Sequence, residues 1–513
     1  MRHSSHLLFL SVVVLLLGSG TNAEGLRKSV KRNLEDSQLC NIQWIDIQFD
    51  DGRAPVKELK CLVDKDWNGY NNGVDDFCYS ITLPSTILEA NDAAIRSGTF
   101  YVAIPNAEII DDGSSVPYVT VPDPSAVAIV QGVRRERHLV DRELQTRYNS
   151  VLVVRVSTSS GDTCDPSANQ LAGSVFGIGS QAIQHSMKSQ YEACSYGQQS
   201  FTPVSGNSVV NGVVDVTIGD NIQGRDIFSL TNAMNRAARD VVGSSLSASP
   251  KHVMYCVPTG TTYNGSQNWV AFAYVNGVSS YYNNNWCDRL SSQMHEVGHN
   301  LGMQHSNENG EYGDQSGYMG FSYPARNGPL MCFNAFKHYK FGWYSSQTRT
   351  ITGAWTGQLV AFTDAAQAPG STVILKLGDV YMQFNRAEGM NSGTTEKKNE
   401  VVLVRESQSG GTSEALAGLG SGESYSTGGF TVEVCSINYG SIDNAQVSIF
   451  TNGGRSGCSN RSVGNSSCQD DLSKYFVVSG NVRNCQWVAA NGAGYLCNGS
   501  AKYWCKSTCG TCP

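Results

Sequence analysis

The chain has 513 residues and a formal net charge of −7, with 16% charged and 40% hydrophobic residues. A chain of this length corresponds to about three or four domains. The acidic balance and the absence of a basic stripe argue against a nucleic-acid partner, because proteins that bind nucleic acid concentrate Lys and Arg on one face. Plentiful glycine (53 residues) and few charges are typical of a loop-rich, largely β, extracellular protein.

The first 23 residues are expected to be a secretory signal peptide. Arg2 and His3 precede a short apolar run at residues 7–17, and small residues follow up to Ala23. A membrane anchor needs a longer apolar span than this one, and no later segment supplies it. The sequence therefore predicts a secreted protein, extracellular or in a cell wall, without a membrane anchor.

Cysteine and sequon content fit the same compartment. Sixteen cysteines are typical of an oxidising environment. Four N-x-S/T sequons are candidate glycosylation sites and predict a glycoprotein: Asn264, Asn460, Asn465 and Asn498.

Residues 24–147 are expected to be a β-rich propeptide. Strands are predicted at Thr99–Ile104, Tyr118–Val121 and Ala126–Val130. The region ends in a basic patch that a processing protease could cut, which predicts a zymogen; the patch includes Arg134, Arg135, Arg137, Arg142 and Arg147. A solvated, charged linker is the alternative interpretation of the patch.

Three cysteines precede this patch, and thirteen follow it. A thiolate from Cys40, Cys61 or Cys78 could occupy an open metal coordination position and keep the enzyme latent. The two odd numbers mean either a disulfide between the two parts or an unpaired thiol in each. Disulfide pairing is the default expectation for each of the three.

Residues 148–346 are expected to form an α/β catalytic domain. Strands are predicted at Val151–Val156, Val209–Ile218, His252–Val257 and Trp269–Val275. Helical spacing covers Ser180–Cys194. A second helix, Asp226–Val242, carries an apolar stripe for the core: Ile227, Leu230, Met234, Ala237 and Val241.

The segment HEVGHNLGMQH, residues 295–305, carries the chemistry. A helix beginning near Asp288 places His295 and His299 one turn apart on one face, where both imidazoles can bind one Zn²⁺. Gly302 accepts a positive φ, so the chain can bend there and bring His305 to the same metal. Glu296 is turned towards this pocket and can act as general base on a metal-bound water. Three histidines leave a position open for water, as in a catalytic zinc site. The long spacing is the metzincin signature.

The glycine-rich segment after the histidines supplies further candidates. Met319 is expected to form the apolar Met-turn floor beneath the metal site, with Met331 as its rival. Tyr323 is a candidate contact for the metal or for a transition-state oxyanion, and a surface tyrosine is the alternative. Asp314 is expected to cap the turn rather than to bind a metal.

Two further units follow. Residues 347–457 are expected to form an antiparallel, β-sandwich-like domain with short strands at Val373–Leu377, Val380–Phe384, Val401–Arg405, Phe430–Cys435 and Ala445–Phe450. Residues 458–513 contain seven cysteines and are expected to be a small disulfide-rich module.

The segments HEVGHNLGMQHS, YGDQSGYMG and PLMCFNAFKHYKFGWY resemble the gametolysin family of metzincin peptidases, over about residues 148–450. The resemblance implies a secreted zinc metalloendopeptidase acting on extracellular or cell-wall proteins and glycoproteins. By it, His295, His299 and His305 match the zinc ligands, Glu296 the catalytic base, and Met319 the Met-turn residue.

The C-terminal spacing resembles a ShKT domain. That resemblance implies three disulfides, Cys468–Cys512, Cys485–Cys505 and Cys497–Cys509, and leaves Cys458 to pair with an upstream cysteine. A channel-blocking activity is not transferred, because Lys502 and Tyr503 lie closer to the next cysteine than in the toxins. A binding or stabilising role is the expectation for this module.

The rival function is a secreted binding or adhesion protein on a metalloprotease fold with little or no catalysis. The intact glutamate in HEVGH argues against it, because loss of that carboxylate is the usual mark of an inactive relative.

Overall fold

The computed structural model describes residues 30–33, 39–51, 53, 55–64, 76–111, 116–130, 147–219, 221–242, 251–320, 328–407 and 411–458, with short pieces at 476–478, 481–483 and 488. The predicted signal peptide, the basic patch up to Arg142, Tyr323, the six ShKT-like cysteines and three of the sequons lie outside these residues. The chain divides into two compact units, the first containing residues up to 345 with 387–398 and 404–416, and the second the remainder.

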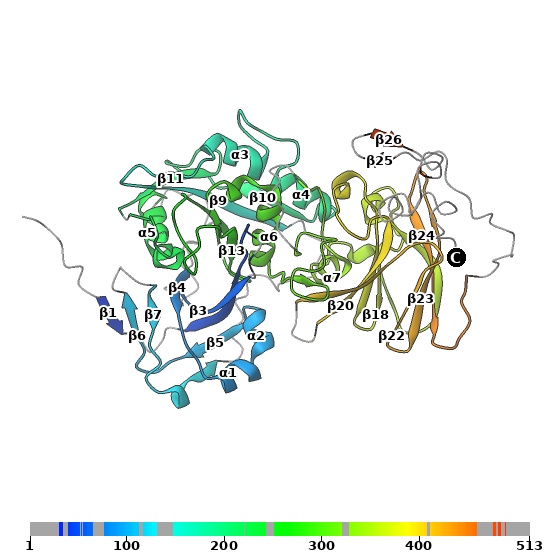
Figure 1. The fold of residues 1–513 in the computed structure, drawn as a ribbon, viewed down its shortest axis with the longest axis horizontal. Helices are drawn as coiled ribbons and strands as arrows, with labels where there is room; N and C mark the ends of the chain where they lie inside the picture. The colour runs from blue at the N-terminus through cyan, green and yellow to red at the C-terminus, as the bar shows by residue number, and fades with distance from the viewer. Residues whose placement is uncertain are drawn as a thin grey trace, which may run out of the picture. The chain divides into compact units, whose positions relative to one another are not determined.

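The N-terminal part of the first unit is an eight-stranded sheet, blue and cyan in Figure 1, in the order β1-β6-β7-β4-β3-β2-β5-β8. A disulfide between Cys40 and Cys61 joins two neighbouring strands, β2 and β3. The elements are β1 (Val30–Asn33), β2 (Cys40–Ile47), β3 (Val56–Asp64), β4 (Asp76–Ser80), α1 (Ser85–Ala90), α2 (Asp92–Arg96), β5 (Phe100–Ala103), β6 (Glu108–Asp111), β7 (Tyr118–Val119) and β8 (Ala128–Val130).

The second sheet of this unit is mostly parallel and runs β10-β9-β12-β14-β13, with β11 also paired to β9. The strand at its edge, β13, is antiparallel to β14, and the other pairs are parallel. The strands are β9 (Arg147–Thr158), β10 (Gln199–Pro203), β11 (Val213–Ile218), β12 (His252–Val257), β13 (Ala271–Ala273) and β14 (Ser279–Asn283).

The helices of this unit complete a mixed α/β fold that is rich in sheet, which confirms the predicted class at that level. They are α3 (Ala168–Phe176), α4 (Met187–Cys194), α5 (Thr231–Val242), α6 (Leu290–Leu301) and α7 (Ala335–Lys340). Two disulfides, Cys194–Cys332 and Cys256–Cys287, connect segments far apart in sequence.

Two predicted helices need correction. The first begins only at Met187, because the Ser186 side chain accepts a hydrogen bond from the Ser189 backbone N–H and caps it there. The second starts as a 3₁₀ turn, Ile227–Ser229, before α5. A 3₁₀ turn has fewer residues per turn than an α-helix, so the positions that face the core after it differ from those that an unbroken α-helix would bury. Val242 is buried, and Val241 is exposed.

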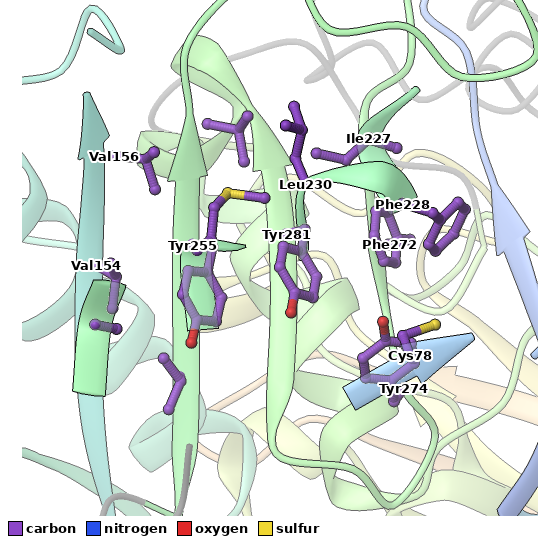
Figure 2. Close-up of a cluster of buried hydrophobic side chains, with 14 of the residues drawn as sticks. Cys78, Val154, Val156, Ile227, Phe228, Leu230, Tyr255, Phe272, Tyr274 and Tyr281 are labelled. Carbon is purple, nitrogen blue, oxygen red and sulfur yellow. The ribbon is translucent and has the colours of Figure 1, made fainter. Parts of the chain in front are cut away.

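One hydrophobic cluster joins the N-terminal sheet to the α/β sheet (Figure 2). Tyr281 stacks on Tyr255 and on Phe272, with ring centroids 4.8 and 4.9 Å apart. In Figure 2, Cys78 lies beside Tyr274. The N-terminal members of the cluster are Ile45, Ile47, Phe49, Leu62 and Cys78. The N-terminal sheet therefore shares its core with the α/β sheet rather than resting on its surface.

The second unit is built of strands. One sheet includes β16, β18, β19 and the start of β20, and another runs β17-β24-β23-β22. The predicted sandwich strands all appear, but β16 and β18 are parallel, unlike the antiparallel pattern expected. The strands are β16 (Thr348–Ile351), β17 (Trp355–Val360), β18 (Ile374–Leu377), β19 (Val380–Asn385), β20 (Glu400–Glu406), β22 (Ser424–Thr427), β23 (Phe430–Asn438) and β24 (Asn444–Thr451).

Three features complete the description. Cys435 pairs with Cys458, so Cys458 does bond to an upstream cysteine. In the first unit, β15 (Ser306–Asn307) pairs with the start of β21 (Ser413–Leu419). In the second unit, β25 (Phe476–Val478) pairs antiparallel with β26 (Asn481–Arg483). Within the described part of the chain, every helix is too short or too polar to cross a membrane.

Candidate metal centre

Helix α6 presents the histidines, and Gly302 ends it. All twelve residues of α6 are buried, so the helix lies wholly inside the unit. Gly302 has φ +100°, and its N–H donates to the His299 carbonyl at 2.8 Å. A glycine adopts this left-handed conformation without steric cost, so the chain can leave the helix and return towards it. His305 lies on this returning segment.

The three imidazoles converge on one point. The His299 Nε2 atom lies 3.1 Å from His295 Nε2 and 3.1 Å from His305 Nε2. Ligands held at about 2.05 Å from a tetrahedral zinc ion lie about 3.3 Å from one another, so the observed spacing is that of a metal site. Within the described part of the chain, this histidine group is one of two that could hold a metal ion; the other consists of Cys164, Cys256 and Cys287, of which the last two form a disulfide.

Each imidazole faces a hydrogen-bond acceptor at its other nitrogen. The Nδ1 atoms lie 2.7 Å from the Tyr318 carbonyl for His295, 2.9 Å from the Met303 carbonyl for His299, and 2.7 Å from a carboxylate oxygen of Glu311 for His305. These acceptors favour the tautomer with the proton on Nδ1, which leaves each Nε2 lone pair directed at the common point. The donor set therefore fits a borderline-soft divalent cation such as zinc.

Burial reinforces this assignment for the two helical histidines. Burial lowers the pKa of His295 to about 3, and burial together with the neighbouring imidazoles lowers the pKa of His299 well below its usual value. Both rings are therefore neutral at physiological pH, and a neutral imidazole is the form that binds a metal.

Glu311 was not predicted from the sequence. It lies six residues after His305, in a loop where no helical or strand period relates the two positions. One carboxylate oxygen faces His305 Nδ1, and the other is ion-paired with Lys57 of β3. Burial opposes the charge on Glu311, but the hydrogen bond with His305 and the contact with Lys57 outweigh it and hold the pKa of Glu311 below its usual range. Tyr312, also not predicted, packs on His305 with ring centroids 4.1 Å apart.

The other predicted residues have clear positions. Glu296 is buried next to His295 on α6, and its charge helps to raise the pKa of the buried Tyr282 hydroxyl. Met319 is buried against α6: a Cβ built on Gly298 would lie 2.8 Å from the Met319 sulfur. Met331, the rival for the Met-turn role, is hydrogen-bonded through its carbonyl to Gln190.

The structure does not support a cysteine thiolate from the N-terminal region as a ligand at the metal centre. Cys40 and Cys61 are bonded to each other, so neither offers a thiolate. Cys78 belongs to the hydrophobic cluster, and its backbone N–H donates to Asn232. In the described residues, the group of potential ligands at this centre contains the three histidines and no cysteine.

A polar network next to His305 was also not predicted from the sequence. The Asn334 side-chain amide donates to Ser306, Asp314 and Ser413 over 2.9–3.1 Å, and its oxygen caps α7. Asp314 also accepts from Ser316, as a turn cap does. The buried Lys337 ammonium, whose pKa burial lowers, donates to the His305 carbonyl at 3.2 Å.

Comparison with known families decides the class of protein. The gametolysin peptidase M11 family model matches residues 149–416, a little over half of the chain. The chain belongs to the gametolysin M11 peptidase family. This confirms the predicted resemblance, and membership makes the protein a metallopeptidase whose activity depends on a metal. No curated protein matches the chain.

In this M11 peptidase, Gly302→Ala is expected to lower the free energy of unfolding by about 1–3 kcal/mol. The alanine would be held at a φ that is unfavourable for any residue with a Cβ. That Cβ would also lie 2.3 Å from the Asn276 side-chain oxygen. The matched control is Gly161→Ala, because Gly161 has φ +96° and open space around it. This variant is expected to lose only the free energy that the positive φ costs an alanine. Chemical denaturation of both variants measures the difference, and equal losses would contradict the predicted clash.

Asn334→Asp is expected to destabilise the peptidase by about 3–5 kcal/mol. The substitution removes the two N–H donors that face Ser306, Asp314 and Ser413, and it places a second carboxylate beside Asp314 in a buried network. Asn438→Asp, on an exposed side chain of the second unit, is the control and is expected to change little. Thermal unfolding in the presence of excess metal measures both. A loss below about 1 kcal/mol for Asn334→Asp would contradict the prediction.

Proposed function

We propose that this protein is a secreted zinc endopeptidase of the metzincin type. Its proposed substrates are the peptide bonds of extracellular or cell-wall proteins and glycoproteins, as the gametolysin resemblance implies. The main support is the convergence of three Nε2 atoms, two pairs of them 3.1 Å apart, from a helix and the bend that follows it. This donor set is the one expected of a catalytic zinc rather than a closed structural site.

His295, His299 and His305 would hold the metal, and their Nδ1 acceptors would fix the direction of each ring. When bound, zinc would polarise the scissile carbonyl and lower the pKa of the attacking water. Glu296 would take the proton from that water and return it to the leaving amine. Met319 packs beneath α6 and gives the site a rigid apolar floor. Tyr323 remains a candidate contact for the oxyanion.

The domain organisation follows from the same proposal. Residues 1–23 serve as a signal peptide, 24–147 as a propeptide, and 148–346 as the catalytic domain. Residues 347–457 form a β-sandwich-like domain, and 458–513 form a ShKT-like module that supports binding or stability. The disulfides at Cys40–Cys61, Cys194–Cys332, Cys256–Cys287 and Cys435–Cys458 agree with an extracellular location.

Metal analysis combined with protein cleavage tests the proposal. The purified chain, after any processing, is incubated with casein or gelatin with and without a chelator, and then with zinc added back. The expected result is about one zinc per chain and cleavage that the chelator abolishes and zinc restores. A chain that binds zinc but cleaves no protein or peptide would support the rival function, a binding protein on a peptidase fold.

A further inference from the structure

The N-terminal region approaches the metal centre through side chains other than cysteine. A pocket that opens onto His299 and His305 is lined on its other side by Trp44, Lys57 and Arg96 of the N-terminal region. Glu311 also lines this pocket. The N-terminal region thus forms one wall of the space in which a substrate would approach the metal.

Backbone pairing fixes one side of this wall. The N–H of Asp50 donates to the Asn268 carbonyl at 3.0 Å, and the N–H of Val270 donates to the Gln48 carbonyl at 2.9 Å. These residues continue β2 and precede β13, the edge strand of the α/β sheet. An extended segment that adds to a free sheet edge in this way uses the same hydrogen bonds as a bound peptide.

A second contact joins the loop after α2 to the α/β part of the unit. The Asn276 side-chain amide donates to the Ser97 carbonyl. Gly98 lies so close to the Val275 backbone that a Cβ would come within 2.4 Å of its carbonyl oxygen. The loop after α2 therefore fits against the catalytic domain without room for a side chain.

Lys57 adds a third contact, with a carboxylate that also bonds one of the histidines. One Glu311 oxygen holds His305 Nδ1 at 2.7 Å, and the other accepts the ion pair from Lys57. The two side chains of the ion pair are 34% and 30% exposed, so the pair is open to solvent on one side. Glu311 therefore links the orientation of His305 to the binding of the N-terminal region.

We propose that Glu311 has two roles: it positions the third metal ligand, and it is the docking point by which Lys57 latches the N-terminal region across the metal cleft. The occupant of the cleft is this chain's own N-terminal region, which contributes Trp44, Lys57 and Arg96, and no cysteine takes part. The inference rests on the proposed peptidase function only for its effect on activity, because docking and metal affinity can be measured without cleavage.

Hydrogen–deuterium exchange on the full-length chain tests the docking. In a Glu296→Gln background, which prevents self-cleavage, Lys57→Glu places two carboxylates together at the latch. The amides of Asp50 and Val270 are expected to exchange about two- to fivefold faster, the scale for loss of one partly exposed ion pair. Lys57→Arg is expected to keep their protection. Lys188→Glu, which breaks an ion pair with Glu192 on α4, is the charge-matched control and is expected to leave both amides unchanged.

Substitutions at Glu311 separate its two roles. Glu311→Gln keeps an oxygen for His305 Nδ1 but loses the charge that binds Lys57, so it is expected to increase exchange as Lys57→Glu does and to retain zinc. Glu311→Ala removes the oxygen as well, and its zinc affinity in a competition with a chromophoric chelator is expected to fall about 10- to 100-fold. Equal zinc affinity in both Glu311 variants would overturn the positioning role.

Activity of the uncut chain on a small fluorogenic peptide completes the test. With Glu296 intact, Lys57→Glu is expected to raise the initial rate of the uncut chain several-fold over the unsubstituted chain and over Lys188→Glu. Unchanged exchange in Lys57→Glu would overturn the latch. Faster exchange with no peptide cleavage in any variant would leave the latch standing and count against the peptidase function instead.

Discussion

Glu296→Gln is expected to lower kcat by about 10²–10⁴-fold while the chain keeps its zinc. The substitution preserves the size and position of a buried side chain on α6 but removes the carboxylate that we propose accepts the proton of the attacking water. Zinc content by atomic emission and kcat on a peptide substrate are the two measurements. Both are needed, because loss of the metal would lower kcat without testing the base.

The control for this substitution is Glu308→Gln, the same chemical change on the segment that follows His305. Glu308 pairs with Lys397 and is not assigned to the reaction. It is expected to leave kcat within about twofold of the original value, because its carboxylate bonds Lys397 and is not part of the histidine group. Near-normal turnover in Glu296→Gln would show that another group acts as the base.

His299→Ala is expected to abolish zinc retention and activity together. His299 is the central ligand, because its Nε2 lies 3.1 Å from those of both other histidines. Zinc content after dialysis against a weak chelator should fall from about one per chain to near zero. The zinc affinity should fall by more than the roughly 10- to 100-fold that follows loss of a hydrogen-bond partner of a ligand.

Thermal unfolding gives a second measure of this loss. A ligand that binds only the folded state stabilises it by about 4 kcal/mol at 1,000 times its Kd. Added zinc should therefore raise the Tm of the metal-free original chain but not that of His299→Ala. His185→Ala, outside the histidine group, is the control. Stoichiometric zinc in His299→Ala would contradict the assignment of the centre.

The histidine centre could be predicted because its geometry is local. Two ligands one helical turn apart and a glycine that permits the bend place three side chains from sequence spacing alone. Glu311 and Asn334 could not be predicted in this way. Glu311 reaches His305 across an irregular loop, and Asn334 meets Ser306, Asp314 and Ser413 only after several loops have packed together.

A helix that is buried along most of its length was missed, whereas a fully buried strand was predicted. Helix α3 was not predicted, because residues 171–176 are all buried and show no helical period. The strand β12, in contrast, was predicted with the correct bounds from its continuous apolar run. The N-terminal contacts with the metal centre join positions far apart in sequence, which no local pattern reveals.

The core shared by the N-terminal sheet and the α/β sheet has a practical consequence for recombinant production. A truncated chain that begins near residue 147 would lack the N-terminal members of the shared cluster, Ile45, Ile47, Phe49, Leu62 and Cys78, and would expose the rest of that cluster. Exposed apolar patches of this kind lead to aggregation. The α/β part should therefore be obtained by expressing the whole chain and cutting it after folding, and the two pieces should elute together from a sizing column until denaturant separates them.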